Sequence, residues 1–303
     1  MYDLIIIGAG PAGITAAVYA ARKRINFLVV SEDIGGQAAW SGDIENYTGY
    51  QFITGPELSL KFEEHMRKFS IQLKEQESAL DIRRQGRGFL VETAKGEYAA
   101  RSLIIASGKR SRELGVPGEK EFKNKGLTYC ATCDGPLFQG KDVAVIGGGN
   151  SALDAAIQLV RIARRVTIIN LGSELSADQV MQEEIKASPQ AAVLNNTQVS
   201  AIIGDNFVKA VRLRQGEKEE TLAVQGVFVE IGLIPNSSFA GIAEKNASGE
   251  IKVDRYNQTN IPGIFAAGDV TDVPEKQIII AAGEGSKAAL SVFRYLIQNR
   301  FIG

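Results

Sequence analysis

Cysteine and histidine are nearly absent from this sequence. Its 303 residues include two cysteines, Cys130 and Cys133, and one histidine, His65. A structural zinc site needs about four ligands, most of them cysteine or histidine. Because His65 is far from the cysteines in the sequence and has no partner at a metal-ligand spacing, we expect no metal site.

Long apolar runs and blocks of like charge are missing too. The formal net charge is −1, from 34 basic and 35 acidic residues, and 45% of the residues are hydrophobic. No apolar run reaches the length of about 20 residues that a transmembrane helix needs, so we expect no membrane-spanning segment. Nucleic-acid-binding proteins carry a clustered basic excess, so a nucleic-acid partner is not expected either.

The N-terminus shows no secretory signal. An aliphatic strand pattern occupies residues 3–7, with no basic segment before it. Thiols that must cycle between dithiol and disulfide are typical of a reducing compartment. We therefore expect a cytoplasmic protein.

Cys130 and Cys133 are separated by two residues and followed by Asp134. This spacing allows the sulfurs to bond to each other and favours the reactive thiolate of one cysteine. An acid directly after the second cysteine is suited to give a proton to a thiolate leaving group. By this motif alone, a structural zinc site and two inert buried cysteines remain alternatives. The redox interpretation requires that the rest of the chain deliver electrons to the pair.

A first nucleotide-binding pattern stands at the N-terminus. A buried-strand pattern leads into Gly8-x-Gly10-x-x-Gly13, a helix of small residues follows, and a second strand pattern ends near Glu32. Gly8 permits the tight turn, Gly10 lets a pyrophosphate approach the backbone, and Gly13 lets helix and strand pack closely. An acid at the place of Glu32 is typical of a contact to a ribose hydroxyl. This order predicts dinucleotide binding.

A second pattern of the same kind follows the cysteines, in the form Gly147-x-Gly149-x-x-Ala152. The strand after it ends at Asn170, where an NAD site usually has an acid and an NADP site has an arginine nearby. Asn170 can bond a ribose hydroxyl more weakly than a carboxylate can. Glu174 is an alternative contact, or simply a surface acid.

The two patterns predict the organisation of the chain. We expect an α/β protein with two Rossmann-like three-layer nucleotide-binding domains, the second inserted in the first. The expected first domain comprises residues 1–115 and 245–303, and the second comprises residues 116–244. Pro117 and Gly118 mark the first boundary. Within the second domain, residues 192–203 are predicted as one strand.

At this point the chain resembles the low-molecular-weight thioredoxin reductase family over essentially its whole length. The resemblance is carried by these segments: Gly8–Gly13, Gly35–Gln37, Asp43–Asn46, Cys130–Asp134, Gly147–Ala152 and Phe265–Asp269. The second half is more similar to the flavoprotein subunit of bacterial alkyl hydroperoxide reductase, through Cys133–Phe138, Ala177–Gln179, Val227–Val229, Gln277–Ile280 and Gly283–Gly285. That flavoprotein has an additional thioredoxin-like module, which we expect to be a separate protein here.

The resemblance implies a bound FAD and a homodimer. The residues expected to bind FAD are Gly8, Gly10, Gly13, Glu32, Gly36, Gln37, Asn46, Gly108, Gly268, Asp269, Gln277 and Ile278. Those expected to bind NADH are Gly147, Gly149, Asn150, Ser151, Ala152 and Asn170. Cys130, Cys133 and Asp134 are the expected catalytic residues.

The implied activity is FAD-dependent reduction of a disulfide in a thioredoxin- or glutaredoxin-like partner. NADPH is the less expected donor, because Asn170, Leu171, Gly172 and Ser176 stand where thioredoxin reductases have a basic cluster. We expect NADH as donor, with reduced ferredoxin as the alternative. A dithiol oxidase and a redox sensor that does not turn over are further alternatives.

Overall fold

The structure is a computed structural model that describes residues 1–41 and 43–302. The chain forms two compact units. Unit 1 comprises residues 1–41, 45–110 and the chain from residue 234 onward, and the body of unit 2 is Ser111–Leu233. The chain leaves unit 1 within β9 (Lys109–Ser111) and returns within β18 (Leu233–Pro235). Both crossings come earlier in the sequence than the expected boundaries after residues 115 and 244.

Unit 1 is built on a mixed sheet with helices on one face. Its helices are α1 (Pro11–Arg22), α2 (Gly55–Arg67), α6 (Ile278–Gln298) and the 3₁₀ helix η1 (Gly36–Trp40). Its strands are β1 (Tyr2–Ala9), β2 (Phe27–Ile34), β4 (Ile53–Thr54), β5 (Gln72–Lys74), β6 (Ala79–Gln85), β7 (Gly88–Thr93), β8 (Glu97–Ile105) and β19 (Ile264–Ala266).

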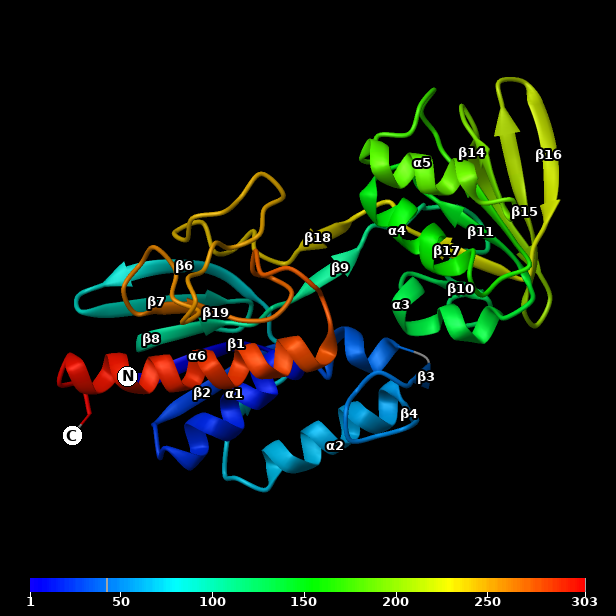
Figure 1. Ribbon diagram of the computed structural model, residues 1–303. Coiled ribbons are helices and arrows are strands. Elements are labelled where there is room, and N and C mark those ends of the chain that lie inside the picture. The colour runs from blue at the N-terminus through cyan, green and yellow to red at the C-terminus, as the bar shows by residue number, and fades with distance from the viewer. Residues whose placement is uncertain (42, 303) are drawn as a thin grey trace. The chain divides into compact units, whose positions relative to one another are not determined.

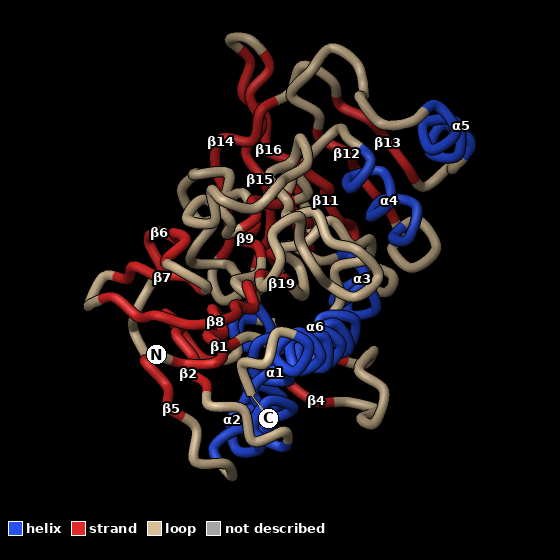
Figure 2. The backbone as a smooth tube through the Cα atoms, turned by 90° about the vertical axis from the view of Figure 1, so that its left-hand side faces the viewer, coloured by secondary structure: helices blue, strands red, loops and turns tan. Residues whose placement is uncertain are grey.

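The sheet of unit 1 has the strand order β5-β2-β1-β8-β7-β6, and β19 also pairs with β8. Strands β5, β2, β1, β8 and β19 are parallel, whereas β7 and β6 are antiparallel to their neighbours. Alternate residues of β1 pack into two different hydrophobic cores, because successive side chains of a strand point to opposite faces. Leu4 and Ile6 join the core beneath α1 and α6, while Ile5 and Ile7 join the core on the other face. Figure 2 shows α1, α2 and α6 on one side of β1, β2 and β8.

Unit 2 repeats this plan with its own sheets. Its helices are α3 (Ala131–Asp134), α4 (Asn150–Leu159), α5 (Gln179–Ala187) and the 3₁₀ helix η2 (Gly135–Phe138). Its strands are β10 (Leu127–Thr128), β11 (Asp142–Ile146), β12 (Arg165–Ile169), β13 (Ala191–Leu194), β14 (Gln198–Gly204), β15 (Val208–Gln215), β16 (Lys218–Ala223) and β17 (Gly226–Val229); the short strand β3 (Asp43–Ile44) is grouped with this unit.

A parallel sheet forms the middle layer of unit 2, in the order β10-β17-β11-β12-β13. Val143 and Val145 of β11 pack on the face that carries α4, while Ala144 and Ile146 pack against the antiparallel sheet β14-β15-β16. Figure 1 shows the helices and the antiparallel sheet on opposite sides of β11 and β17. The predicted α/β class with two Rossmann-like three-layer units is thus confirmed.

The prediction of one strand over residues 192–203 is wrong. The chain turns at Asn196, whose φ is 52°, and β13 and β14 belong to different sheets. An asparagine tolerates this left-handed conformation better than most residues do. Across the described ranges 1–41 and 43–302, no helix has the length and apolar character needed to cross a bilayer.

Candidate active site

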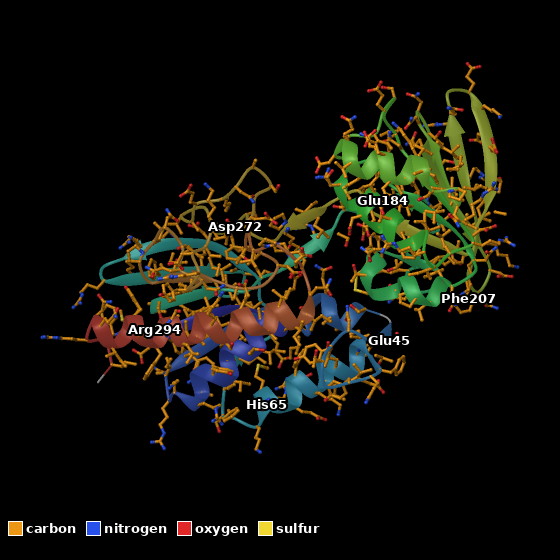
Figure 3. All side chains as sticks on the ribbon, viewed as in Figure 1. Glu45, His65, Glu184, Phe207, Asp272 and Arg294 are labelled. Carbon is orange, nitrogen blue, oxygen red and sulfur yellow. A yellow bond between two sulfur atoms is a disulfide. The ribbon has the colours of Figure 1, made fainter. Side chains whose placement is uncertain are left out.

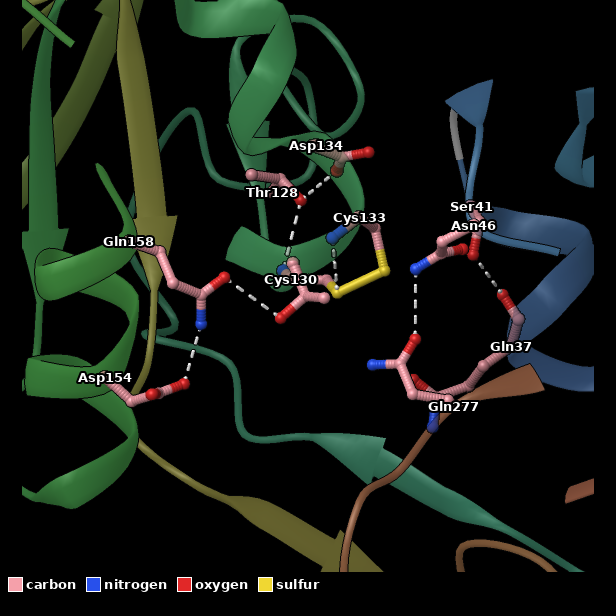
Figure 4. The surroundings of a disulfide bond; sticks show 11 residues. Gln37, Ser41, Asn46, Thr128, Cys130, Cys133, Asp134, Asp154, Gln158 and Gln277 are labelled. Atoms are coloured by element: carbon pink, nitrogen blue, oxygen red, sulfur yellow. Dashed lines mark hydrogen bonds between the residues drawn. A yellow bond between two sulfur atoms is a disulfide. The ribbon is translucent and has the colours of Figure 1, made fainter. Parts of the chain in front are cut away.

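The two cysteines form a disulfide at the start of a short helix in unit 2. Cys130 is the residue before α3, and Cys133 lies within it; their Cα atoms are 5.3 Å apart. The backbone N–H of Cys133 donates a hydrogen bond of 3.2 Å to Sγ of Cys130 (Figure 4). Both side chains are partly exposed. The sulfur of Cys130 therefore takes the place of the N-cap acceptor of this helix.

Asp134 is buried and held by a residue that no sequence motif indicated. The hydroxyl of Thr128, at the end of β10, donates a hydrogen bond to the Asp134 carboxylate. The same hydroxyl accepts a hydrogen bond of 3.2 Å from the backbone N–H of Cys130 (Figure 4). Thr128 thus connects the expected acid to the redox pair, and its place two residues before Cys130 is the only signal in the sequence.

A polar chain runs from the redox segment to α4. The hydroxyl of Thr132 donates to Oε1 of Gln158 at 3.2 Å, and Nε2 of Gln158 donates to Asp154 at 2.8 Å. These contacts tie the exposed side of the Cys-x-x-Cys turn to α4 (Figure 4). Glu230, directly after β17, is a further acid that belongs to none of the predicted motifs.

The second glycine turn has the expected strand–turn–helix form. Gly147 follows β11 with φ 140°, and a Cβ atom there would lie 2.3 Å from the carbonyl oxygen of Glu230. Gly149 is the N-cap of α4, which begins with Asn150 and Ser151, and Ala152 is fully buried against the sheet. The turn therefore requires glycine at Gly147 for both backbone conformation and space.

The loop after β12 lies against this turn. The backbone N–H of Ser176 donates to the carbonyl of Gly148 at 2.8 Å, and that of Asp178 donates to the side-chain oxygen of Asn150 at 2.8 Å. Nδ2 of Asn150 in turn donates to the Asp178 carboxylate at 3.1 Å. Asn150 thus holds the loop at the N-terminus of α4.

Asn170 is buried and directed into its own loop. Its Nδ2 donates to the carbonyls of Gly172 and Glu174 at 3.1 and 2.9 Å, and to Oδ1 of Asn195 at 2.8 Å. Its Oδ1 accepts a hydrogen bond from the N–H of Gly172 at 3.3 Å. An amide with these contacts has little hydrogen-bonding capacity left for a ligand, whereas a carboxylate at this position would accept hydrogen bonds from the ribose hydroxyls.

The expected FAD residues all belong to unit 1, and three of them, Gly8, Gly10 and Gly13, form the turn from β1 into α1. Gly8 ends the extended part of β1 with φ 105°, and a Cβ atom at Gly13 would lie 1.9 Å from the Gly8 carbonyl oxygen. A Cβ atom at Gly10, by contrast, would have nothing nearer than 3.9 Å. Gly8 and Gly13 are thus required by packing, while the surface of Gly10 is left clear. Glu32 is an exposed residue of β2.

Further residues of this set belong to η1, to the chain before α2 and after β8, and to the start of α6. Gly36 and Gln37 open η1, and the Gln37 amide donates to the carbonyl of Lys109. Nδ2 of Asn46 donates to Oε1 of Gln277 at 3.1 Å. Gln277 is the N-cap of α6, and Ile278 is its first residue. Gly108, with φ 67°, has open space at its Cβ position.

Asp269 follows Gly268 at the end of β19, beside a cluster of charged side chains. Burial raises the pKa of Asp269, and the positive charges of Lys276 and Lys109 oppose this rise. Lys109 and Glu250 form a buried ion pair, and Nζ of Lys276 lies 3.3 Å from the same Glu250 oxygen. Burial, with the charge of Lys109, lowers the pKa of Lys276. This region of unit 1 therefore combines cations with a carboxylate at the carboxyl end of a parallel strand.

The helix termini at both glycine patterns are suited to anionic ligands. No side chain caps α1 or α4, and neither has an acidic residue in its first turn. Helix α2, by contrast, has a full capping box made by Thr54 and Glu57. Uncapped N–H groups behind a glycine turn are the usual partners of a pyrophosphate. The residues present thus fit a dinucleotide at each site.

His65 takes no part in these sites. It is an exposed residue of α2 (Figure 3). Its ring is tilted against that of Phe69, with the centroids 6.0 Å apart. Within the described ranges, no cluster of three or more histidine, cysteine, aspartate or glutamate side chains could hold a metal ion.

Comparison with known proteins identifies relatives over nearly the whole chain. Residues 2–285 match the family model described as pyridine nucleotide-disulphide oxidoreductase. The chain is 44% identical over 302 residues to a Bacillus subtilis protein named NADH dehydrogenase, and 44% identical over 307 residues to a subunit of the alkyl hydroperoxide reductase of Pseudomonas aeruginosa. Each alignment covers 98% of this chain but 59% of the relative, so the chain spans about three-fifths of the length of these relatives.

A solved structure shares the complete fold. The thioredoxin reductase of Streptococcus pyogenes superposes with a TM-score of 0.93 at 37% sequence identity, covering 98% of this chain and 99% of that one. The resemblance to thioredoxin reductases and to the alkyl hydroperoxide reductase flavoprotein is thereby confirmed.

Proposed function

The chain belongs to the pyridine nucleotide-disulphide oxidoreductase family, and we propose that it reduces a disulfide of a thioredoxin- or glutaredoxin-like protein with electrons from a bound FAD. The family and the thioredoxin reductase fold support the enzyme class of a flavin disulfide oxidoreductase. The observation that carries the proposal is the Cys130–Cys133 disulfide with Asp134 fixed beside it through Thr128.

FAD would be held by unit 1. The proposed phosphate contacts are the backbone around Gly10 and the N-terminus of α1, and Glu32 is the proposed partner of a ribose hydroxyl. Gln37, Asn46, Asp269, Gln277 and Ile278 are proposed to line the remainder of the site. When bound, the flavin would supply the electron pair that reduces the disulfide.

The residues of unit 2 would carry those electrons to the partner. Two electrons cleave the Cys130–Cys133 bond into two thiolates, and Asp134 provides a proton to one of them, as a general acid close to a leaving group does, so that one thiol and one thiolate remain. The Cys130 thiolate then attacks the disulfide of the partner and forms a mixed disulfide. Cys133 attacks Cys130, which restores the internal disulfide and releases the partner as a dithiol.

NADH is the proposed donor. The turn of Gly147 and Gly149, with the uncapped N-terminus of α4, supports dinucleotide binding at the second site. No arginine stands in the segment 170–178, where an NADP phosphate would need one. Reduced ferredoxin is a second candidate donor, favoured by the engagement of Asn170 within its own loop. We propose a cytoplasmic homodimer as the working form.

Anaerobic titration of the flavin-loaded protein separates these candidates. We expect NADH to bleach the flavin, NADPH to do so at much higher concentration, and an oxidised thioredoxin-like protein to restore the colour. If only reduced ferredoxin bleaches the flavin, the donor is ferredoxin and not NADH. Reduction by a dithiol followed by hydrogen peroxide release in oxygen would identify an oxidase, and failure of every donor would favour a sensor.

Trapping tests the order of the cysteines. Cys133→Ser should accumulate a stable mixed disulfide between Cys130 and the partner, because the resolving thiol is missing. Cys130→Ser is the matched control and should trap nothing. Trapping by Cys130→Ser alone would reverse the two roles.

A further inference from the structure

Glu230 follows β17 at the level at which Cys130 follows the neighbouring strand β10. In the parallel pair β10–β17, Thr128 is in register with Phe228, and Cys130 and Glu230 each follow two residues later. Neighbouring strands lie about 4.8 Å apart. Both residues therefore leave the sheet side by side at its carboxyl edge.

The backbone of Glu230 is firmly placed. Its N–H donates to the carbonyl of Ile146 at 2.8 Å, and its own carbonyl packs closely over the Gly147 turn. Its carboxylate lies close enough to the backbone N–H of Ala131, the residue directly after Cys130, for this dipole to lower the pKa of the acid. One peptide unit thus connects this acid to the redox pair.

Glu230 is partly buried and no cation acts on it in the described part of the chain. Asp154 on α4 adds a negative charge nearby, and the α3 segment contributes Cys130, Cys133 and Asp134 as its titratable groups. Burial raises the pKa of Glu230 to about 7, the Ala131 N–H opposes the rise, and Asp154 adds to it. The acid therefore exchanges its proton in the pH range in which thiols react.

We propose that Glu230 is a positioning residue whose ionisation sets the reactivity of the Cys130 thiol and the reduction potential of the Cys130–Cys133 pair. Reducing the disulfide places a negative charge on one sulfur, and an ionised Glu230 repels that charge. Reduction consequently draws a proton onto Glu230. The balanced step converts the disulfide, the Glu230 carboxylate, two electrons and two protons into one thiol, one thiolate and the Glu230 carboxylic acid.

This inference rests on the proposed disulfide chemistry, but it can be tested without donor or partner. The flavin-loaded protein is equilibrated in dithiothreitol redox buffers at several pH values, and Cys130 and Cys133 are then alkylated and counted by mass. Glu230→Gln keeps an oxygen for the Ala131 N–H and never ionises. Glu220→Gln is the matched control, because Glu220 is an exposed acid of β16 in the same unit and should leave the potential of the pair unchanged.

At about pH 8 the cysteine pair of Glu230→Gln should be about tenfold easier to reduce than the wild-type pair. The reason is that a nearby negative charge raises the pKa of a thiol by about one unit or more. Tenfold corresponds to about 30 mV for this two-electron couple. At about pH 6, where the wild-type Glu230 is protonated and as uncharged as the glutamine, the two proteins should coincide. Reduced Cys130 should likewise be alkylated faster in Glu230→Gln than in wild type at about pH 8, and at the same rate in both proteins at about pH 6.

Equal potentials of wild type and Glu230→Gln at the higher pH would overturn the proposal. So would a difference of equal size at both pH values, which a purely structural role would produce. If Glu230→Gln fails to fold, Glu230→Ala, which carries no ionisable group at this position either, takes its place in the same comparison. Failure of every donor to reduce the flavin would affect the proposed function and leave these potentials unchanged.

Discussion

The hydroxyl of Thr128 donates a hydrogen bond to the carboxylate of Asp134. Because the same hydroxyl accepts from the N–H of Cys130, the acid and the start of the redox turn are held by one side chain at the end of β10. The orientation of Asp134 therefore depends on a residue of β10 as well as on the Cys-x-x-Cys-Asp sequence.

Replacing Thr128 by valine should disturb both stability and turnover. The change removes a donor from a buried carboxylate, which costs about 1–3 kcal/mol, and it frees Asp134 to rotate away from the sulfurs. We expect a lower free energy of unfolding in urea and slower reduction of a protein disulfide, with the rate of flavin reduction unchanged. Thr128→Ser keeps the hydroxyl and should stay near wild type. Equal loss in both variants would contradict this role.

Restoring an acid at the end of β12 should strengthen NADH binding. In Asn170→Glu, a carboxylate can accept hydrogen bonds from both ribose hydroxyls, whereas the asparagine amide is engaged with Gly172, Glu174 and Asn195. We expect the KM for NADH to fall by about tenfold, the equivalent of about one charge-assisted hydrogen bond, with little change for NADPH. Steady-state kinetics with both nucleotides measures this. An equal effect on both would indicate a general change in the loop.

Two glycines of the first turn should respond differently to alanine. Gly13→Ala should prevent folding of unit 1, because its Cβ atom would lie 1.9 Å from the Gly8 carbonyl oxygen. Gly10→Ala should fold, because its Cβ atom has nothing nearer than 3.9 Å, yet it should lose FAD if a pyrophosphate rests on that surface. Melting of the flavin-free proteins and flavin content after reconstitution distinguish the two. Normal flavin content in Gly10→Ala would place the pyrophosphate elsewhere.

The ion pair of Lys109 and Glu250 should make the stability of unit 1 depend on pH. Burial alone would raise the pKa of Glu250, but hydrogen bonds from Lys109 and Asn246 outweigh it, and the pKa lies below its ordinary value of 4.5. A lowered pKa contributes stability that is present above the unfolded value and is lost as the pH falls through the folded value. We therefore expect the ion pair to stabilise unit 1 by a constant amount near neutral pH, and this stabilisation to be lost as the pH falls below 4.5.

Glu250→Gln measures this contribution. Removing one partner of a buried pair costs about 3 kcal/mol, and the difference from wild type should shrink in acid as Glu250 becomes protonated. Glu244→Gln is a suitable control, because Glu244 pairs with Lys252 at the surface, where both side chains are about half exposed. That exposed pair should contribute little, because solvent screens its charges. Urea unfolding across the acid range gives both values, and a pH-independent difference would contradict the pairing.

Local patterns predicted much of the fold. The run into Gly8 and Gly13 predicted β1 and α1 because a buried parallel strand needs aliphatic residues on both faces and a close helix needs glycine. The break at Asn196 was missed, because the residues on either side have strand character and only their placement in different sheets separates them.

The sequence by itself thus determined the two glycine turns, the redox spacing of Cys130 and Cys133, and the presence of an acid after them, since each depends on neighbouring residues along the chain. The tertiary structure alone decided how other side chains are placed around that pair. Thr128 bonds Asp134 and Cys130, the pairing of β10 with β17 sets the level of Glu230, and Asn170 turns into its own loop. Strand register and side-chain direction depend on packing across about a hundred residues, which no local pattern records.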